Sequence, residues 1–328
     1  MLASAITRAQ VAAWVLPSRT LRRRAWPVLL GLAYILAVAL LGGLRFDHVL
    51  IGLLGLLDLY NEKTRSFLRH FWPFILTGAI FDSMRYFYWQ GIAGRVHVVE
   101  PYVNERAWFG VGGQTPNEWL AAHPNLVFDL LCGFAYLVYV GEYLAFAFLL
   151  FFRRRFDMVD VLARAFLVVN LLGFATYFLY PAAPPWYVNA FGLGPARMHI
   201  QPFAAGANRF DQILGTHLFD QMYGRGVDVY GAYPSLHVSY PLIAAWACFR
   251  AAELKWARPI GVGFFFLMCF SAVYLQHHYV TDVVLGVVYA VVTLALVARA
   301  QRSAVRASSV QPGASGSSEA WASDRARS

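Results

Sequence analysis

Long runs of apolar residues separated by short polar segments dominate this chain. Eight such runs cover residues 27–44, 49–59, 70–88, 126–152, 159–180, 235–249, 259–276 and 280–298. Most approach the ~20 residues that an α-helix needs to cross the hydrocarbon core of a bilayer. The second run is short and the sixth is marginal, so we expect either to be tilted, extended by its flanks or partly re-entrant. The pattern predicts an all-α fold, a polytopic membrane helical bundle.

The composition supports the bilayer as the solvent of this chain. Hydrophobic residues make up 59% of it and charged residues only 14%, which is too apolar for a globule with a water-facing surface. The net charge of +9 does not indicate nucleic acid binding, because the basic residues form short clusters between apolar runs. The cysteines Cys132, Cys248 and Cys269 lie inside apolar runs without Cys-x-x-Cys spacing, so we expect neither a disulfide framework nor a thiolate metal site.

Basic clusters orient the predicted bundle. They lie at residues 19–24, 63–69, 153–155, 250–258 and 299–306. If the N-terminus is cytoplasmic and every run spans, all five clusters are cytoplasmic, and the longer loops at 89–125 and 181–234 lie outside with fewer positive charges per residue, as the positive-inside rule requires. No convincing cleavage site follows the first run, so we expect an uncleaved anchor. Both termini are therefore predicted to be cytoplasmic.

The same pattern divides the chain into four parts. Residues 1–25 are predicted to be a basic cytoplasmic segment, 26–60 about two accessory transmembrane helices, and 61–302 a six-helix catalytic core. Residues 303–328 are rich in Ser, Ala and Gly without apolar periodicity, so we expect a disordered tail. The Ala- and Arg-rich composition hints at a bacterial inner membrane protein whose outer face is periplasmic; the equivalent in a eukaryote would be a Golgi lumen.

Ionisable residues gather at the outer ends of two predicted helices. His237 opens the run at 235–249, and His278 and Asp282 open the last run. Because His278 and Asp282 are four residues apart, they share a helix face, and the carboxylate can hold the imidazole in one tautomer as a nucleophile. His237 lies in the first turn of its helix and can serve as a general acid and base.

Ser235 occupies the position of an N-cap just before His237. A helix N-terminus offers free backbone N–H groups and the positive end of the helix dipole to an anion such as phosphate. Ionisable groups at membrane depth are costly, and here several lie at one level on one side. These residues predict a site for phosphoryl transfer at the outer surface.

At these residues the chain resembles the type 2 phosphatidic acid phosphatase superfamily. The superfamily pattern Pro-Ser-Gly-His is matched by Pro-Ser-Leu-His at 234–237, and the later Ser-Arg-x5-His-x3-Asp is matched at Ser271, His278 and Asp282. Two features depart from it: Ala272 stands in place of the Arg, and the upstream Lys-x6-Arg-Pro element is absent, with residues 180–186 at the corresponding helix end.

Further elements resemble one branch, which contains the inositol phosphorylceramide synthases. They are the Leu of Pro-Ser-Leu-His, the Pro-Pro-Trp segment at 184–186, the double His277-His278, Pro101-Tyr102, and Phe81-Asp82-x-x-Arg85-Tyr86. The resemblance implies that His278 attacks phosphorus to give a phosphohistidine and that Asp282 orients it. His237 would protonate the leaving oxygen and then activate the acceptor hydroxyl.

Substrate contacts are assigned on the same basis. We expect Ser235, Arg225, Arg85, Asp82 and His277 to bind substrate. Phosphoryl transfer needs cations around the equatorial oxygens, and the candidates on the outer side are Arg225, Arg209, Arg197 and Arg85, with Arg225 first because a short loop joins it to the Pro-Ser-Leu-His motif. No Asp- or Glu-rich Mg²⁺ site is evident, so we expect no metal and no cofactor.

The predicted function is that of a lipid phosphotransferase, which moves a phosphorylated head group from a phospholipid donor to a lipid or alcohol acceptor. With water as acceptor, the same residues would make a lipid phosphate or polyprenyl pyrophosphate phosphatase, and the choice depends on pocket shape and water exclusion. A membrane transporter would use Glu142 and Asp82 along a path for substrate or protons, but no inverted repeat in the sequence supports this alternative. For Asp82, Asp129 and Glu142, a structural hydrogen bond and head-group recognition both stay open.

Overall fold

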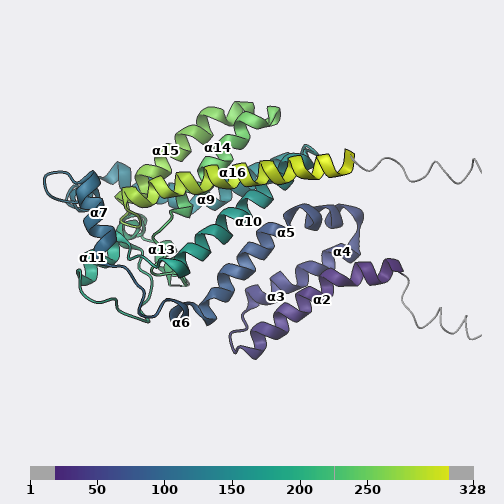
Figure 1. Cartoon of the computed structure of the whole chain (residues 1–328), viewed down its shortest axis with the longest axis horizontal. Helices are drawn as coiled ribbons and strands as arrows, with labels where there is room; N and C mark the ends of the chain where they lie inside the picture. Colours follow the sequence, from purple (N-terminus) through teal and green to yellow (C-terminus); the bar gives the residue numbers. More distant parts are fainter. Residues whose placement is uncertain (1–18, 225, 310–328) are drawn as a thin grey trace, which may run out of the picture.

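The computed structural model describes residues 19–224 and 226–309 (Figure 1). In these residues the regular structure is helical, with isolated β-bridges and no strand. Six helices of 15 or more residues follow residue 60: α5 (Glu62–Ser83), α9 (Leu126–Phe152), α10 (Phe156–Leu179), α14 (Leu236–Arg250), α15 (Arg258–Tyr274) and α16 (Val280–Ser309). The prediction of an all-α membrane bundle is confirmed.

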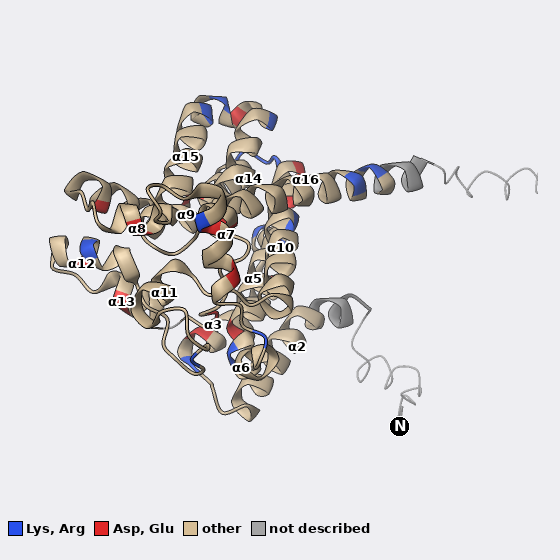
Figure 2. Ribbon diagram, turned by 60° about the vertical axis from the view of Figure 1, so that its left-hand side comes forward, with Lys and Arg blue, Asp and Glu red and all other residues tan. Residues whose placement is uncertain are grey.

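Four stretches of the described chain are long and apolar enough to cross a membrane. They are Leu126–Phe152, Phe156–Leu179, Ala252–Tyr274 and Val280–Ser303. Four predicted spans are not among them: the runs at 27–44 and 49–59, α14, which has only 15 residues, and α5, which includes five charged residues, mainly in its first two turns. Figure 2 shows the charged residues mainly in loops and towards helix ends, with long uncharged stretches between them. The predicted total of eight spans therefore stays a prediction.

Helix α14 lies at the centre of the bundle. It packs against α9, α10, α15 and α16, and α5 packs on the outer side of α10. Small residues allow the close approach of α14 and α15, since a Cβ on Gly261 would lie 3.2 Å from Cα of Ala245. Close packing of this kind stabilises helix pairs in a bilayer, where lipid tails are as apolar as the side chains. The short, largely buried helix α14 is thus held firmly by its neighbours.

An accessory hairpin lies beside α5 (Figure 1). It consists of α2 (Arg19–Leu40), α3 (Phe46–Leu53), η1 (Leu54–Leu56) and α4 (Leu57–Tyr60). The predicted short run at 49–59 is therefore divided by a 3₁₀ turn. Helix α2 also begins before the predicted boundary at residue 26.

The loops between the long helices contain short helices that hydropathy did not predict. They are η2 (Met84–Tyr86), α6 (Tyr88–Ile92), α7 (Val99–Phe109), α8 (Pro116–Ala121), α11 (Pro185–Phe191), η3 (Ala205–Ala207), α12 (Asn208–Leu214) and α13 (Leu218–Tyr223); η4 (Ala252–Ala257) lies at the other end of the bundle. Figure 1 shows α6, α7, α11 and α13 gathered at the end where α14 and α16 begin. These loops thus cover that end of the bundle with ordered structure.

Backbone hydrogen bonds join three of these loops. The amide of His97 donates to Pro181 O at 2.8 Å, and that of Ala183 donates back to His97 O at 2.9 Å. Ala182 donates to Tyr230 O at 2.8 Å. The segment that leads into α14 is thereby fixed against loops from two other parts of the chain.

The C-terminal boundary differs from the predicted one. Helix α16 continues to Ser309, so residues 303–309 are helical rather than part of a disordered tail. Ala, Arg, Val and Ser continue the helix here, and Ala and Arg are strong helix formers. The rest of the predicted tail, 310–328, and residues 1–18 of the predicted basic segment lie outside the described residues.

Candidate active site

A tight turn between α15 and α16 presents His278. The amides of His277 and His278 both donate to Ala272 O, at 3.2 and 3.0 Å. From α8, the side chain of Asn117 donates to Val273 O and His278 O, each at 2.9 Å. Asn117 is almost fully buried, so its amide closes the turn from inside.

The surroundings of His278 select one tautomer of its imidazole. Nδ1 lies 3.2 Å from Oδ2 of Asp282 and 3.0 Å from the carbonyl oxygen of Ala232. Both neighbours are hydrogen-bond acceptors, so Nδ1 carries the proton and Nε2 presents its lone pair. Asp282 is itself held by the amide of Tyr279 at 2.9 Å. The side chains of His278 and Asp282 are almost completely buried.

His237 faces the free nitrogen of His278. Its Nδ1 lies 3.0 Å from His278 Nε2, and its ring packs between Tyr136 and Tyr139, with centroids 4.5 and 4.7 Å away. His237 is half-buried whereas His278 is 4% exposed, so solvent or substrate reaches the pair from the His237 side. The structure thus brings His237, His278 and Asp282 into one chain of contacts.

Ser235 stands at the N-cap of α14, but its side chain does not cap the helix. Instead its amide donates to Asp282 O at 3.1 Å, which ties α14 to α16. A Cβ on Gly286 would lie 2.4 Å from Ser235 O, so only glycine permits this approach. The predicted N-cap position of Ser235 is confirmed, and close packing of its backbone against α16 fixes the residue there.

Several buried polar atoms around the histidines have no hydrogen-bond partner among the described residues. They are Ser235 Oγ, Tyr136 Oη, Tyr223 Oη and His277 Nε2. The ring of His277 stacks on Tyr223 with centroids 4.6 Å apart, and burial lowers the pKa of His277 to about 3, so it is neutral near pH 7. Unpaired buried polar atoms are rare in native proteins and often mark a ligand or water site.

Glu105 was missed by the sequence analysis. Its carboxylate, fully buried on α7, accepts the amides of Val280 and Thr281 at 2.8 and 3.0 Å and the Thr281 hydroxyl at 3.1 Å. It thus caps α16 from a distant segment and places a negative charge at the positive end of the helix dipole. Burial raises the pKa of Glu105, an effect that these hydrogen bonds oppose. No local pattern in the sequence reveals such a cap.

We expect Glu105→Ala to lower turnover about tenfold with little change in KM, because two amides at the start of α16 lose their acceptor and Asp282 shifts. Glu105→Gln, which keeps one acceptor oxygen, should retain more activity. Glu100→Ala is the matched control, since Glu100 is exposed on the same helix. Steady-state kinetics of the three variants test the role, and equal activity of the Glu105→Ala and Glu100→Ala variants would refute it.

Asp228 is the second residue that the sequence analysis missed. It lies half-buried in the segment before the Pro-Ser-Leu-His motif, between the buried Val227 and Val229, and no described side chain donates a hydrogen bond to it. Burial raises the pKa of Asp228 to about 6, and nearby His278 opposes that shift. A partly exposed carboxylate of this kind can accept hydrogen bonds from substrate hydroxyls.

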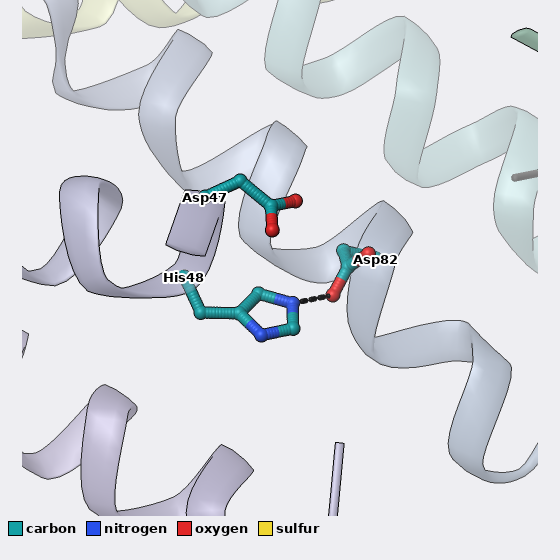
Figure 3. Close-up of side chains that lie close together, drawn as sticks. All are labelled: Asp47, His48 and Asp82. Carbon is teal, nitrogen blue, oxygen red and sulfur yellow. Dashed lines mark hydrogen bonds and ion pairs between the residues drawn. The ribbon is translucent and has the colours of Figure 1, made fainter. Parts of the chain in front are cut away.

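Asp82 and Arg85 lie in a separate cluster at the end of α5. Figure 3 shows Asp47, His48 and Asp82, with His48 Nε2 pointing at Asp82. Arg45 binds both carboxylates at 2.7 Å, and Arg85 also pairs with Asp82. No contact joins Asp82 or Arg85 to the histidine pair among the described residues, so a substrate role for either would be indirect.

The ligand atoms of Asp47, His48 and Asp82 lie within 4.8 Å of one another, a spacing that could suit a metal ion. However, His48 Nδ1 accepts the Arg45 amide at 3.1 Å, so Nε2 carries the proton and donates to Asp82. The guanidinium groups of Arg45 and Arg85 already neutralise the carboxylates. The donor set therefore fits an ion-pair network that fastens the accessory hairpin to α5.

The other arginine candidates either contact groups outside the histidine site or lie outside the described residues. Arg209 donates to Asp129 at 2.6 Å, and Tyr274 donates to the same oxygen at 2.8 Å, so Asp129 makes structural hydrogen bonds. The guanidinium of Arg197 lies over the ring of Phe191, 4.7 Å from its centroid. Arg225 lies outside the described residues.

Comparison with known proteins agrees with this geometry. The sequence profile of the PAP2 superfamily matches residues 103–296. A phosphoinositol dihydroceramide synthase of Bacteroides thetaiotaomicron is 33% identical over 268 residues, which cover 77% of this chain and 84% of that protein. The inositol phosphorylceramide synthase catalytic subunit of Schizosaccharomyces pombe is 29% identical over 185 residues, 55% of this chain and 42% of that protein.

The Saccharomyces cerevisiae catalytic subunit is 30% identical over 176 residues, 53% of this chain and 43% of that protein, so the match covers less than half of each of these two fungal relatives. No solved structure matches the chain significantly. The matched region includes both histidine motifs and Glu105. The chain therefore belongs to the PAP2 superfamily, in the branch of the inositol phosphorylceramide synthases, and is a membrane lipid phosphotransferase or phosphatase.

Proposed function

We propose that this enzyme transfers a phosphoinositol head group from a phospholipid to the hydroxyl of a ceramide-type lipid, through a phosphohistidine on His278. The observation that carries the proposal is the contact chain Asp282–His278–His237, in which the acceptors at Nδ1 of His278 leave the lone pair on Nε2 for the attack. The printed names of the bacterial and fungal relatives supply the head group and the class of acceptor.

In the first step, His278 Nε2 forms a bond to phosphorus while the bond from phosphorus to the glycerol oxygen breaks. His237 donates a proton to that oxygen, and diacylglycerol leaves. Asp282 and the Ala232 carbonyl support the positive charge that develops on the imidazole. Because the two imidazoles are only 3.0 Å apart, their rings must separate to admit the phosphate.

In the second step, His237 removes the proton of the acceptor hydroxyl. The hydroxyl oxygen attacks phosphorus, and the bond from phosphorus to His278 breaks, which restores the neutral imidazole. Burial of His278 and Asp282, at 4% and 0% exposure, favours a lipid over water as acceptor, since exclusion of water suppresses hydrolysis. A phosphatase would use the same residues with water in this step.

Asp228 supplies recognition of the head group in this scheme. An ionised carboxylate accepts several hydrogen bonds and suits a polyol such as inositol. The unpaired hydroxyls of Tyr136 and Tyr223 add polar partners around the same histidines. A head group with fewer hydroxyls would leave these groups unpaired.

We expect Asp228→Asn to lower kcat/KM for phosphatidylinositol about 10–100-fold, as loss of a hydrogen bond to a charged group implies. The loss for phosphatidylglycerol, with its smaller head group, should be much less. Asp220→Asn is the matched control, because Asp220 is exposed on α13. Competition between the two donors in one reaction measures the selectivity directly, and an equal loss for both donors would exclude a role in recognition.

The raised pKa of Asp228 has a consequence for stability. The ordinary pKa of an Asp is 3.8 and that of Asp228 is about 6, so the folded state binds more protons between these values and the free energy of unfolding falls as pH rises through this window. At pH 7.5, the Asp228→Asn variant should therefore melt a few °C higher than the wild type. The difference should vanish near pH 4, which thermal unfolding in detergent can check.

We also propose that the site faces the non-cytoplasmic side, the periplasm in a bacterium, with both termini cytoplasmic. The basic residues Arg153 and Arg250 lie at the ends of α9 and α14 that are remote from His237, in accord with the positive-inside rule. A membrane-impermeant thiol reagent applied to intact cells tests the orientation. Cysteine introduced at Asn189 should react, and cysteine at Arg154 should not.

The acceptor is tested with purified enzyme and phosphatidylinositol labelled with ³²P in the head group. With ceramide present, we expect the label in a phosphoinositol ceramide, and without it only slow hydrolysis. Release of labelled inositol phosphate at the same rate with and without ceramide would instead establish a phosphatase. Absence of turnover with every acceptor would reject the proposed function.

A further inference from the structure

A large cavity separates the accessory hairpin from α5. Its volume is about 920 Å³, and its walls are mainly apolar. Leu30 of α2, Ile51 of α3 and Leu54 of η1 line one side, and Leu68, Ile75 and Leu76 of α5 line the other.

The packing of the hairpin explains why this space exists. A Cβ on Gly31 would lie 1.8 Å from Gly52 O, so α2 and α3 are drawn into direct backbone contact. The hairpin meets α5 chiefly at its two ends, where α4 packs on α5 and where Arg45 and His48 bind Asp82. Between these two attachments the helices stay apart.

The walls of the cavity remain largely uncovered by protein. Leu30 is 50% exposed, Trp72 48% and Leu76 40%. In a bilayer, exposed apolar side chains contact acyl chains. A concave apolar space of this size between helices can hold one bound lipid, whereas a flat helix surface makes only transient contacts with lipids.

One end of the cavity is polar and includes a guanidinium group that makes no ion pair with a described residue. Asp58, Arg65 and Arg69 line it. Arg65 is already paired with Asp58 and Glu62, whereas the exposed Arg69, one turn further along α5, makes no ion pair with a described residue. A guanidinium group without an ion pair, beside an apolar cavity, can bind a phosphate through two parallel hydrogen bonds.

We propose that this cavity binds an anionic phospholipid, with the phosphate on Arg69 and an acyl chain along Leu30, Ile75 and Leu76. A neutral ceramide would leave Arg69 without a counter-ion. Arg69 and Asp82 are 13 residues apart on α5, or about 20 Å along the helix axis, and the histidines lie beyond the Asp82 end. The lipid is therefore a second, non-reacting one, which joins the accessory hairpin to the core.

Native mass spectrometry of the full chain tests this site with two probes, phosphatidylglycerol and phosphatidylcholine of identical acyl chains. We expect the wild type to retain phosphatidylglycerol more strongly. Arg69→Gln should weaken retention of phosphatidylglycerol about tenfold, to the level of phosphatidylcholine. Arg153→Gln is the matched control, an exposed arginine outside the cavity, and should behave as the wild type.

A second variant tests the acyl-chain part. Ile75→Trp fills the cavity and should weaken retention of both lipids, with thermal unfolding used to verify the fold. Lipid bound in the active site contributes equally to the retention measured for every variant. The test therefore uses only the differences in retention between variants, and these differences do not depend on the proposed reaction. Equal retention by the Arg69→Gln and Arg153→Gln variants, or full retention by Ile75→Trp, would overturn the proposal.

Discussion

The His278→Ala variant should lose at least about 10³-fold in turnover and form no phosphoenzyme, because alanine offers no nucleophile. The fold should survive, since Asn117 binds the backbone carbonyl of His278 rather than its side chain. The remaining ring of His237 cannot substitute, because Asp282 and the Ala232 carbonyl orient only His278. Turnover, phosphoenzyme level and melting temperature are the three measurements.

The control for this variant is His123→Ala. His123 is an exposed histidine at the outer end of the bundle, where its ring stacks on Trp119. It should have wild-type activity. Substantial activity in the His278→Ala variant would mean that another group attacks phosphorus.

The Asp282→Asn variant should lose about 10²–10⁴-fold in kcat with a smaller change in KM. One oxygen of Asp282, Oδ2, contacts both His278 Nδ1 and the Tyr279 amide, so an Asn with its oxygen in that place still accepts both hydrogen bonds. It removes, however, the negative charge that supports the imidazolium. Because the Ala232 carbonyl still favours the productive tautomer, we expect a loss near the lower end of this range.

Single-turnover kinetics with labelled donor separate this effect from a binding defect. A slow first step at saturating donor is the expected result. A rate close to that of the wild type would show that Asp282 acts only as a helix-joining residue through its backbone contact with Ser235.

Hydropathy was sufficient to predict the four helices that are long and apolar enough to span a bilayer. The positions of α9, α10, α15 and α16 follow from the length that a bilayer requires, whereas the outer location of both histidine motifs rests on the basic clusters and stays a prediction. The i, i+4 spacing of His278 and Asp282 also predicted their contact, because that contact is local to one helix.

Contacts between distant segments could not be predicted in this way. Glu105 meets the start of α16 across 175 residues, and Asn117 meets His278 across 161. The partners of Asp82 include His48, 34 residues away on the accessory hairpin. None of these pairs leaves a periodic pattern, since the partner is chosen by loop packing rather than by helix geometry.

For two residues, the position in the sequence did not reveal the role of the side chain. Ser235 has the sequence context of a capping residue, yet the approach of Gly286 leaves its backbone, not its hydroxyl, to make the contact with α16. Asp228 has no motif around it, and its interest arises only from its partial burial and from the electrostatic influence of His278 on its pKa.

The most direct test of the account is to trap the covalent intermediate. The enzyme is mixed with ³²P-labelled phosphatidylinositol without ceramide and quenched within milliseconds, and the labelled peptide is mapped by mass spectrometry. The account predicts an alkali-stable, acid-labile label on His278 that disappears when ceramide is added. A label on another residue, or full transfer to ceramide with no labelled protein at any time, would contradict it.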